Sequence, residues 1–292
     1  LSDAEELEKE RDERKPMAVV VPYSYATLET ILSYFVTVFL EDPIFKYRPF
    51  TTEDTVGVAL LEKVIELQCL RNRVGLNLHT QFRDSFAYGF GVTSPYWREE
   101  YGTVTMRDAA GARIRQKQML FEGNGLINID PYKYLPDPSV PIHEPQRGSF
   151  NGWFNSTNYI ELLSLEQYDS NCFNAQYVQH IDGRSSLLED SSGRETKVGG
   201  TARTVDQSDL TAPVDEIIMV VNIIPSEWKL GKGKYPEKWL FRLAGDEIVT
   251  EASPLELDHN QYPVCVSAPN FDGYSLTPIS SLEIIYGLQE IL

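Results

Sequence analysis

Two aspartates in one proline-rich stretch are the first residues whose types and spacing could do chemistry. The stretch DPYKYLPDPSVP covers residues 130–141, and Asp130 and Asp137 each stand directly before a proline. Paired carboxylates can act as a general acid and base when they face one cleft. Asp-Pro is also a frequent turn initiator, because the aspartate binds its own backbone and the proline fixes the next φ angle. Nothing else in the sequence supplies a convergent cleft, so we expect turns here and no catalytic pair.

The histidines and cysteines give no pattern typical of metal or nucleophile chemistry. The histidines are His79, His143, His180 and His259. None of them forms an H-x-x-x-H or H-E-x-x-H spacing, so a zinc site is not predicted. The cysteines are Cys69, Cys172 and Cys265. Their odd number and unpaired spacing predict free thiols in an intracellular chain. We expect no metal and no cofactor.

The densest group of basic residues lies between two expected strands. These residues are Lys229, Lys232, Lys234 and Lys238. They could be the solvated tip of a hairpin that keeps a strand edge from aggregating, or they could contact DNA or a partner protein. The GKGK run among them is not a phosphate-binding loop of the G-x-x-x-x-G-K-[ST] type, and no G-x-S-x-G nucleophile elbow occurs either.

A second basic set, Arg113, Arg115 and Lys117, alternates along an expected strand. Alternation places the three side chains on one face of the strand. A solvated face is the default interpretation of such a charge pattern.

Composition limits the classes of function that fit. The chain has 292 residues, a formal net charge of −17, 42% hydrophobic residues and 11% aromatic residues. It can therefore bury a sizeable core, and wholesale disorder is excluded. So negative a chain is not expected to grip nucleic acid over its whole surface. The longest apolar stretch, ILSYFVTVFL, is too short to span a bilayer, so we expect no membrane partner.

The first third of the sequence predicts helices. Residues 2–14 are highly charged and open on a capping box, which predicts a solvated helical arm. Apolar spacing predicts helices at 24–40, from 51 or 52 to 67, and at 74–88, with Ser24 and then Thr51 or Thr52 as N-caps. Residues 44–50, IFKYRPF, alternate like a strand. The helix at 74–88 should end at Gly89.

After Val92 the pattern changes to that of strands. Residues 92–129 predict a hairpin around the turn DAAG, and 216–228 predict a central strand. Ser156 or Thr157 should cap a short helix, and a hairpin is expected around residues 245–246. The end of the chain predicts a helix with Thr277 as its cap. Residues 182–213 are rich in serine, glycine, threonine and charge, and predict a long mobile loop.

These elements predict an α+β fold with amphipathic helices in the N-terminal third, followed by β-hairpins and a mixed sheet. We divide the chain into a charged arm (1–16), a first body part (17–181), the polar loop (182–213) and a second body part (214–292). Because the chain begins without Met and stops within a helical pattern, we expect it to be a portion of a longer protein.

The succession of four motifs resembles the portal proteins, the head-to-tail connectors of tailed bacteriophages. An amphipathic helix leads to DPIFKYRPF, and two helices later comes FRDSFAYGFGVTSPYW. A hairpin then leads to INIDPYKYLPDPSV, and the last motif is QYPVCVSAPNFDGYSLTPISSLEIIYGLQEIL. Together they cover most of residues 17–292. The TPIS segment is less regular than the family pattern, and the polar loop has no counterpart in it.

The resemblance implies a structural role without catalytic turnover. Portals are homo-oligomeric rings of about twelve subunits at one capsid vertex, with a portal-like wing and body in each subunit. Double-stranded DNA passes through the ring, terminase drives it, and capsid or scaffold and tail or head-completion proteins bind around it. The protein would be part of the virion, assembled in the host bacterial cytoplasm, with stem and clip segments after residue 292. An acidic channel would bind phosphates weakly and let DNA slide, although the charge could equally be a solvated outer surface.

Two other interpretations stay open. Another phage capsid or tail-adaptor protein would also form a ring but would lack the stem and clip. An acidic α+β hydrolase, such as a glycoside hydrolase, would need two carboxylates about 5–10 Å apart across a cleft. The helical first third and the lack of clustered aromatic and acidic residues argue against the hydrolase.

Overall fold

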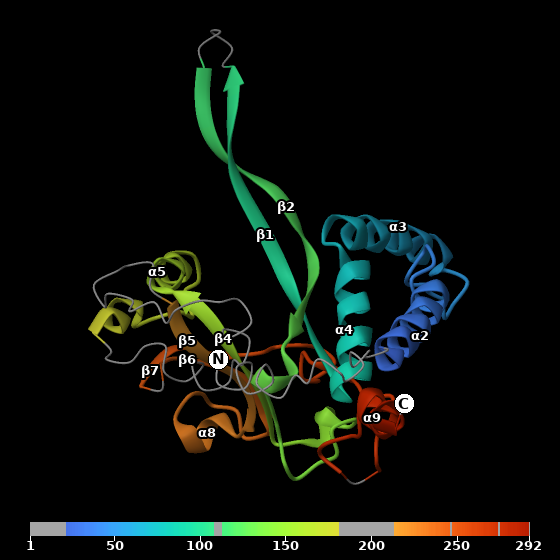
Figure 1. Ribbon diagram of the computed structural model, residues 1–292. Coiled ribbons are helices and arrows are strands. Elements are labelled where there is room, and N and C mark those ends of the chain that lie inside the picture. Colours follow the sequence, from blue (N-terminus) through green and yellow to red (C-terminus); the bar gives the residue numbers. More distant parts are fainter. Residues whose placement is uncertain (1–21, 108–112, 181–212, 246, 274, 292) are drawn as a thin grey trace, which may run out of the picture.

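The computed structural model describes residues 22–107, 113–180, 213–245, 247–273 and 275–291. Helices and antiparallel sheets form an α+β fold, as predicted. In Figure 1 the helices α2, α3, α4 and α9 lie on one side of a long β-ribbon, and a five-stranded sheet with α5 lies on the other. The expected arm at 1–16 and nearly all of the loop at 182–213 fall outside the described residues.

The first helices follow the predicted apolar spacing. They are α2 (Tyr23–Phe39), α3 (Thr55–Arg71) and α4 (Val74–Tyr88). Phe35 of α2 meets Phe82 and Phe86 of α4 with ring centroids 5.7 and 4.9 Å apart. These edge-to-face contacts hold α2 against α4. Gly89 ends α4 at a φ of 92°, a left-handed conformation that favours glycine.

The predicted N-caps of these helices are wrong. Pro22 precedes α2, so Ser24 already lies inside the helix, and Asp54 rather than Thr51 or Thr52 precedes α3. Asp54 accepts hydrogen bonds from the amide and hydroxyl of Thr51, at 3.1 and 2.7 Å. The aspartate therefore closes a turn before the helix, and the threonine is the donor rather than the cap.

The predicted strand at residues 44–50 is also wrong. The segment is an irregular crossing from α2 to α3. The amide of Tyr47 donates to the side chain of Glu62 on α3, at 2.9 Å, and Pro49 has no amide to donate. Alternation alone was misleading here, because the segment packs along a helix instead of pairing with a strand.

A long antiparallel ribbon follows α4. It consists of β1 (Gly91–Arg107) and β2 (Arg113–Ile129), paired from Val92–Ile129 to Arg107–Arg113. A third strand, β8 (Cys265–Ser267), pairs only with the base of β1. The side chain of Asn77 on α4 donates to the carbonyl of Leu126, at 2.6 Å, and so fixes the lower ribbon to α4. The rest of the ribbon extends away from the body (Figure 1).

The second sheet has the order β3-β4-β5-β6-β7 and is antiparallel throughout. Its strands are β3 (Tyr134–Pro136), β4 (Phe150–Asn158), β5 (Pro213–Ile223), β6 (Glu237–Ala244) and β7 (Ile248–Pro254). The predicted central strand is confirmed as β5, but it ends at Ile223, and residues 225–228 form a short helix instead. The predicted hairpin joins β6 to β7. The prediction of a mixed sheet is wrong, because strands that neighbour one another in sequence also pair in space.

Short helices complete the sheet region. They are η1 (Pro131–Lys133), η2 (Pro145–Arg147), α5 (Tyr159–Tyr168), η3 (Ala175–His180) and α8 (Pro225–Trp228). Asn158 caps α5 by accepting from the amide of Glu161, at 2.8 Å, so neither Ser156 nor Thr157 is the cap.

The last helix, α9 (Ser281–Ile291), begins later than predicted. Ser280 accepts from the amide of Glu283, at 2.9 Å, so Thr277 is not its cap. Within the described ranges, none of the helices has the length and apolar content that a bilayer crossing requires.

Two buried clusters form the core. One joins the base of the ribbon to the five-stranded sheet and consists of Val92, Ile129, Tyr134, Ile142, Trp153, Ile218 and Val264. The other lies beneath α5 and consists of Tyr159, Leu162, Ala175, Val178, Val214 and Ala244. Neither cluster includes a residue of α2 or α3, although Leu28 and Leu32 of α2 and Phe86 of α4 are buried outside them.

Candidate functional site

The predicted basic group lies in the connection between β5 and β6, but only three of its lysines belong together. Lys229, Lys232 and Lys234 are exposed on the loop that follows α8. Lys229 has a φ of 60° and ends that helix. These three lysines are the solvated tip that the first interpretation predicted. They also remain accessible to a partner.

Lys238 is separated from the other lysines by its position in β6. Its ammonium group lies 4.1 Å from the centre of the Tyr262 ring and donates to the carbonyl of Asn260, at 2.5 Å. Burial lowers the pKa of this lysine. Lys238 therefore fastens the segment after β7 to the sheet, which is a structural contact.

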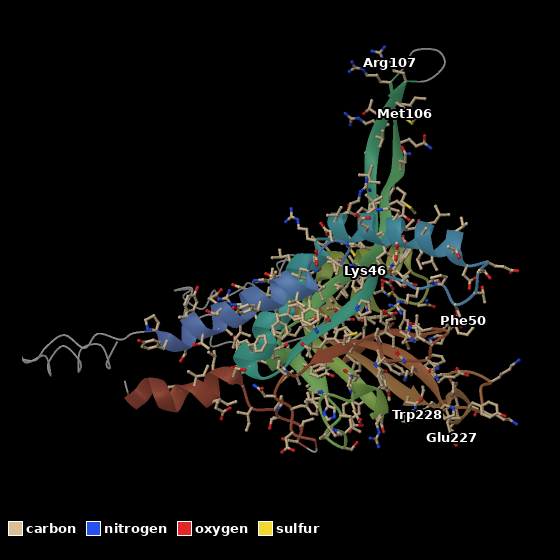
Figure 2. All side chains as sticks on the ribbon, turned by 90° about the vertical axis from the view of Figure 1, so that its right-hand side faces the viewer. Lys46, Phe50, Met106, Arg107, Glu227 and Trp228 are labelled. Atoms are coloured by element: carbon tan, nitrogen blue, oxygen red, sulfur yellow. The ribbon has the colours of Figure 1, made fainter. Side chains whose placement is uncertain are left out.

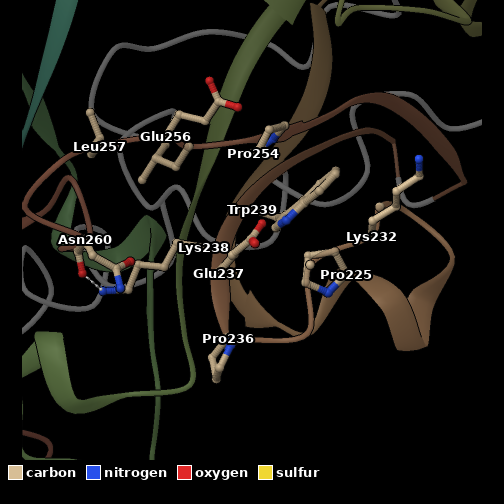
Figure 3. Close-up of a pocket in the computed structure, with 13 residues that line it drawn as sticks. Pro225, Lys232, Pro236, Glu237, Lys238, Trp239, Pro254, Glu256, Leu257 and Asn260 are labelled. Atoms are coloured by element: carbon tan, nitrogen blue, oxygen red, sulfur yellow. Dashed lines mark hydrogen bonds between the residues drawn. The ribbon is translucent and has the colours of Figure 1, made fainter.

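A hollow of about 420 Å³ lies beside the basic loop. Figure 3 shows Trp239 in its middle, Lys232 near Pro225 on one side and Lys238 with Asn260 on the other. The carboxylates of Glu237 and Glu256 also line it. With two acidic and two basic side chains around an apolar wall, the hollow does not concentrate the positive charge that a phosphate site needs.

The two aspartates that opened the sequence analysis are turn residues, as predicted. Asp130 accepts from the amide of Tyr132, at 3.1 Å, at the start of η1. Asp137 accepts from the hydroxyl and amide of Ser139, at 2.6 and 2.8 Å, and from the amide of Ser149, at 2.7 Å. These hydrogen bonds hold the pKa of the Asp137 carboxyl below its usual value. Asp137 thus ties together two loops, 12 residues apart, that flank β3 and β4.

The histidines and cysteines do not come together. His143 stacks on Phe271 with ring centroids 4.3 Å apart, and His259 accepts from the amide of Gln261, at 3.0 Å. His79 lies half-buried on α4. In the part of the chain that the structure describes, no three histidine, cysteine or acidic side chains form a group that could hold a metal ion.

All three cysteines are free thiols, as predicted. Burial, followed by the carboxylates of Glu251 and Asp169, raises the pKa of the Cys172 thiol to about 12. Partial burial also raises the pKa of Cys69. Neighbouring groups desolvate Cys265 and raise its pKa as well, although its side chain reaches the surface. Because the thiolate is the nucleophilic form, the environments of these cysteines work against nucleophilic chemistry.

Sequence analysis missed a charged triad on the five-stranded sheet, in which two buried carboxylates meet the partly exposed Arg242. The Arg242 guanidinium lies 2.7 Å from the carboxylate of Glu251 on β7 and 3.8 Å from that of Glu216 on β5. The side chains of Glu216 and Glu251 are only 2% and 6% exposed. A signal was present, because Glu216 and Arg242 interrupt the apolar runs of two strands.

The triad could in principle serve as the carboxylate pair of a hydrolase. Such a pair must face a cleft with room for substrate and water. Here both carboxylates are buried and directed at one guanidinium, and Glu216 also accepts from the side-chain amide of Asn155, at 3.0 Å. The three side chains therefore link strands β5, β6 and β7 and do not present an acid and a base to a substrate.

The most unusual surface is on α3. None of its 17 residues is buried. Five apolar side chains are more than half exposed and form what we call the α3 stripe: Val56 (72%), Leu60 (65%), Val64 (51%), Leu67 (55%) and Leu70 (66%). At 100° per residue these positions fall on one face of the helix. An apolar stripe so exposed is typical of a surface that a partner covers.

Exposed aromatic side chains add to this pattern. Phe50, just before α3, is 99% exposed, and Trp228 on α8 is 67% exposed. Figure 2 shows both at the same side of the molecule, Phe50 below α3 and Trp228 lower still. Aromatic residues are favoured anchors at subunit interfaces.

Comparison with known proteins gives no assignment. No family model and no curated protein matches this chain. The relation to portal proteins therefore stays a prediction from the order of the motifs. The function must be argued from the surfaces that the fold exposes.

Proposed function

We propose that this chain is a subunit of a portal-type connector, a ring at one vertex of a tailed-phage capsid. The succession of motifs supports the family, and the exposed α3 stripe is the observation that supports assembly. An isolated subunit would leave the stripe in water, at a cost of about 25 cal/mol for each Å² of apolar surface. Burial of the stripe between subunits removes that cost.

A ring accounts for the stripe better than a symmetric pair does. A closed ring uses two different surfaces of each subunit, so that each copy offers one surface and accepts the other. The stripe lies on the helical side of the molecule, and other exposed apolar groups lie elsewhere, on the ribbon and on α8. Two unlike apolar surfaces on one chain fit a contact of this kind.

The proposed role needs no chemistry from the ring itself. Double-stranded DNA would pass through the channel under the action of terminase, and capsid or scaffold and tail or head-completion proteins would bind the outside. The net charge of −17 fits this role. An acidic protein makes few attractive contacts with phosphates, so the moving duplex would not be slowed. On this account the protein is part of the virion and is not an enzyme.

The test is the mass of the purified protein together with negative-stain images of the same sample. We expect rings of about twelve copies with a central hole. Leu60→Asp should reduce the ring population strongly, because it places a charge in the middle of the stripe. Gln167→Asp, on the exposed face of α5, is the matched control and should leave the rings intact.

The proposal is wrong if the wild-type chain remains monomeric at high concentration, both alone and with scaffold protein. Rings that bind a tail protein but no terminase would instead identify a tail adaptor. If the monomer shows hydrolase activity, for example on a glycoside, the chain is an acidic α+β hydrolase instead.

A further inference from the structure

The outer part of the ribbon has two faces of opposite character. A register shift between Glu100 and Tyr101 marks where it begins, and we call residues 101–107 and 113–120 the distal ribbon. Residues that pair directly across an antiparallel ladder lie on the same face. The pairing therefore assigns every residue of the distal ribbon, apart from the one at the shift, to one of two faces.

One face is basic. The pairs Arg107–Arg113, Thr105–Arg115, Thr103–Lys117 and Tyr101–Met119 lie on it. All four basic residues of the distal ribbon are on this face, and the described segments of the distal ribbon contain no acidic residue. Lys117 lies 5.0 Å from the centre of the Tyr101 ring. A basic face of this density is unusual in a chain whose net charge is −17.

The other face, which we call the apolar face, carries no charged side chain. Its pairs are Met106–Ile114, Val104–Gln116 and Gly102–Gln118. Leu120, the residue at the register shift, lies over Gly102, where a Cβ would clash with the Leu120 side chain. Met106, Ile114 and Leu120 are 52%, 47% and 56% exposed.

The distal ribbon lacks support from the rest of the chain. Figure 2 shows Met106 and Arg107 near its end, well beyond α3. The contacts of α3 with the ribbon lie lower, where Gln68 accepts from the side chain of Asn124, at 3.0 Å, and Arg71 lies over the ring of Phe121. A two-stranded ribbon exposed on both faces is marginally stable in water. Such a ribbon would gain stability from a partner that covers one of its faces.

Two kinds of partner fit parts of this surface. DNA could take the basic face, since the major groove admits a two-stranded ribbon. DNA would leave the apolar face in water, however, and it would not explain the exposed α3 stripe. A protein with an exposed apolar stripe would cover the uncharged face, and this chain itself has such a stripe on α3.

We propose that the apolar face of the distal ribbon packs on the α3 stripe of a second copy of the chain. The two surfaces match in length. From Val56 to Leu70 the helix rises about 21 Å, and seven residues of strand span about 23 Å. The stripe is apolar, and the ribbon face combines exposed Met106, Ile114 and Leu120 with Gln116 and Gln118. The two surfaces are exposed and unlike each other, so their contact runs head to tail and can close into a ring.

Charge also favours a second copy. The segment around the stripe, residues 41–73, contains six acidic and five basic residues and is close to neutral, whereas the whole chain carries a net charge of −17. The distal ribbon brings four basic residues from its neighbour. These basic residues lie on the face that points away from the stripe, so they do not pair with α3, but they attract the acidic neighbour as it approaches. The closure of this contact into a ring rests on the function proposed above, but the pairing of the two surfaces does not.

Photo-crosslinking in the full chain tests the pairing. Ile114, on the apolar face, is replaced by benzoylphenylalanine, and unlabelled copies are mixed with ¹⁵N-labelled copies before irradiation. We expect cross-linked peptides that join residue 114 of one copy to residues 55–71 of another. The same probe at Arg115, on the opposite face, is the matched control and should give no cross-link to that helix.

A second experiment introduces opposite charges at residues 114 and 60. If the two residues meet across the contact, mixing the variants should restore assembly, which would not happen if each substitution only disturbed folding. Ile114→Lys and Leu60→Glu should each raise the concentration at which half the copies assemble by about tenfold or more. An equal mixture of the two variants should assemble better than either alone, because the new charges meet across the contact. Urea unfolding of each variant as a monomer confirms that it is folded.

The outcomes separate the two proposals. Rings without the cross-link between residue 114 and α3 would overturn the pairing and leave the connector function standing. A chain that stays monomeric would overturn both. If a fluorescent duplex binds at physiological salt, loses that binding in Arg113→Glu with Arg115→Glu, and no cross-link to α3 forms, the distal ribbon is a DNA-binding arm and the pairing is wrong.

Discussion

The five-stranded sheet differs from α3 and the distal ribbon in how far it buries its side chains. In the sheet, Val214 and Val220 of β5 are completely buried, and even Glu216 is only 1% exposed. In the helical region, α3 buries none of its residues. The distal ribbon likewise exposes its apolar residues. The sheet buries its apolar side chains within the chain, whereas α3 and the distal ribbon leave theirs exposed to water.

This difference separates the residues that stabilise the folded monomer from those that stabilise its assembly. A region with a closed core and paired buried charges is stable by itself, so substitutions there should act on the free energy of unfolding. A region with exposed apolar stripes gains its burial from another molecule, so substitutions there should act on association. The predictions below test this division, from the largest expected effect to the smallest.

The first prediction removes the charge that both buried carboxylates share. Arg242→Leu should lower the free energy of unfolding by about 3–5 kcal/mol, because it leaves Glu216 and Glu251 buried without a counter-charge. Arg83→Leu is the control in the helical region, where Arg83 pairs with Glu29 at 3.1 Å and both side chains are more than a third exposed. That exposed pair should contribute about 0–1 kcal/mol. Urea unfolding below the assembly concentration measures both.

A triple variant sharpens this result. Adding Glu216→Gln and Glu251→Gln to Arg242→Leu should recover about half of the loss, because the amides carry no charge to be buried. Equal losses for Arg242→Leu and Arg83→Leu would mean that the two regions do not differ in their ion pairs.

The second prediction compares two leucines on helices. Leu162 of α5 is 3% exposed and belongs to a core cluster, whereas Leu60 of α3 is 65% exposed. Leu162→Ala should cost about 2–5 kcal/mol of unfolding free energy. Leu60→Ala should change the stability of the monomer by about 0.5 kcal/mol or less. Ring assembly should respond in the reverse order, and a large loss of monomer stability for Leu60→Ala would break the comparison.

The third prediction concerns the Asp137 turn and its pH dependence. Asp137→Asn should cost about 2 kcal/mol at pH 7, because three hydrogen bonds to a carboxylate are lost or weakened. The folded pKa lies below the unfolded value of about 3.9. The stabilisation is therefore present above about pH 4 and is lost as the pH falls through the folded pKa.

Urea unfolding at pH 7, 5 and 3 tests this sign. The difference between wild type and Asp137→Asn should stay constant from pH 7 to 5 and shrink at pH 3. Asp54→Asn is the matched control in the helical region. Its pKa is also lowered, by hydrogen bonds from Thr51, but Asp54 is fully exposed, so its effect should be smaller. A difference that grows on acidification would refute the assignment.

The order of elements was largely predictable from the sequence, because apolar periodicity is a local signal. The bounds of α4 agree with the predicted residues 74–88, and the turn roles of Asp130 and Asp137 follow from Asp-Pro chemistry. The predicted caps at Ser24, at Thr51 or Thr52, at Ser156 or Thr157, and at Thr277 were wrong. In α5 and α9 a neighbouring polar residue, Asn158 or Ser280, is the cap instead, whereas α2 and α3 have no side-chain cap.

The candidate surfaces were less predictable, because they depend on what each element packs against. The apolar residues of α3 have the spacing of a core helix, and only the fold shows that no core covers them. The four lysines were grouped by their closeness in sequence, but the start of β6 separates the last one from the others. The charged triad joins three strands through side chains that are far apart along the chain.

The last and smallest prediction divides the basic group itself. Lys238→Ala should cost about 1 kcal/mol, since it removes the contact with the Tyr262 ring and the hydrogen bond to Asn260. Lys232→Ala should leave the stability unchanged, because Lys232 is exposed on the loop. If the loop binds a partner, Lys232→Ala should instead weaken that binding and make it less sensitive to salt. Urea unfolding measures the stability of both variants, and a salt titration measures partner binding. We expect Lys238 to affect stability and Lys232 to affect only binding. An equal loss of stability in both variants would mean that the grouping of the lysines by sequence was correct.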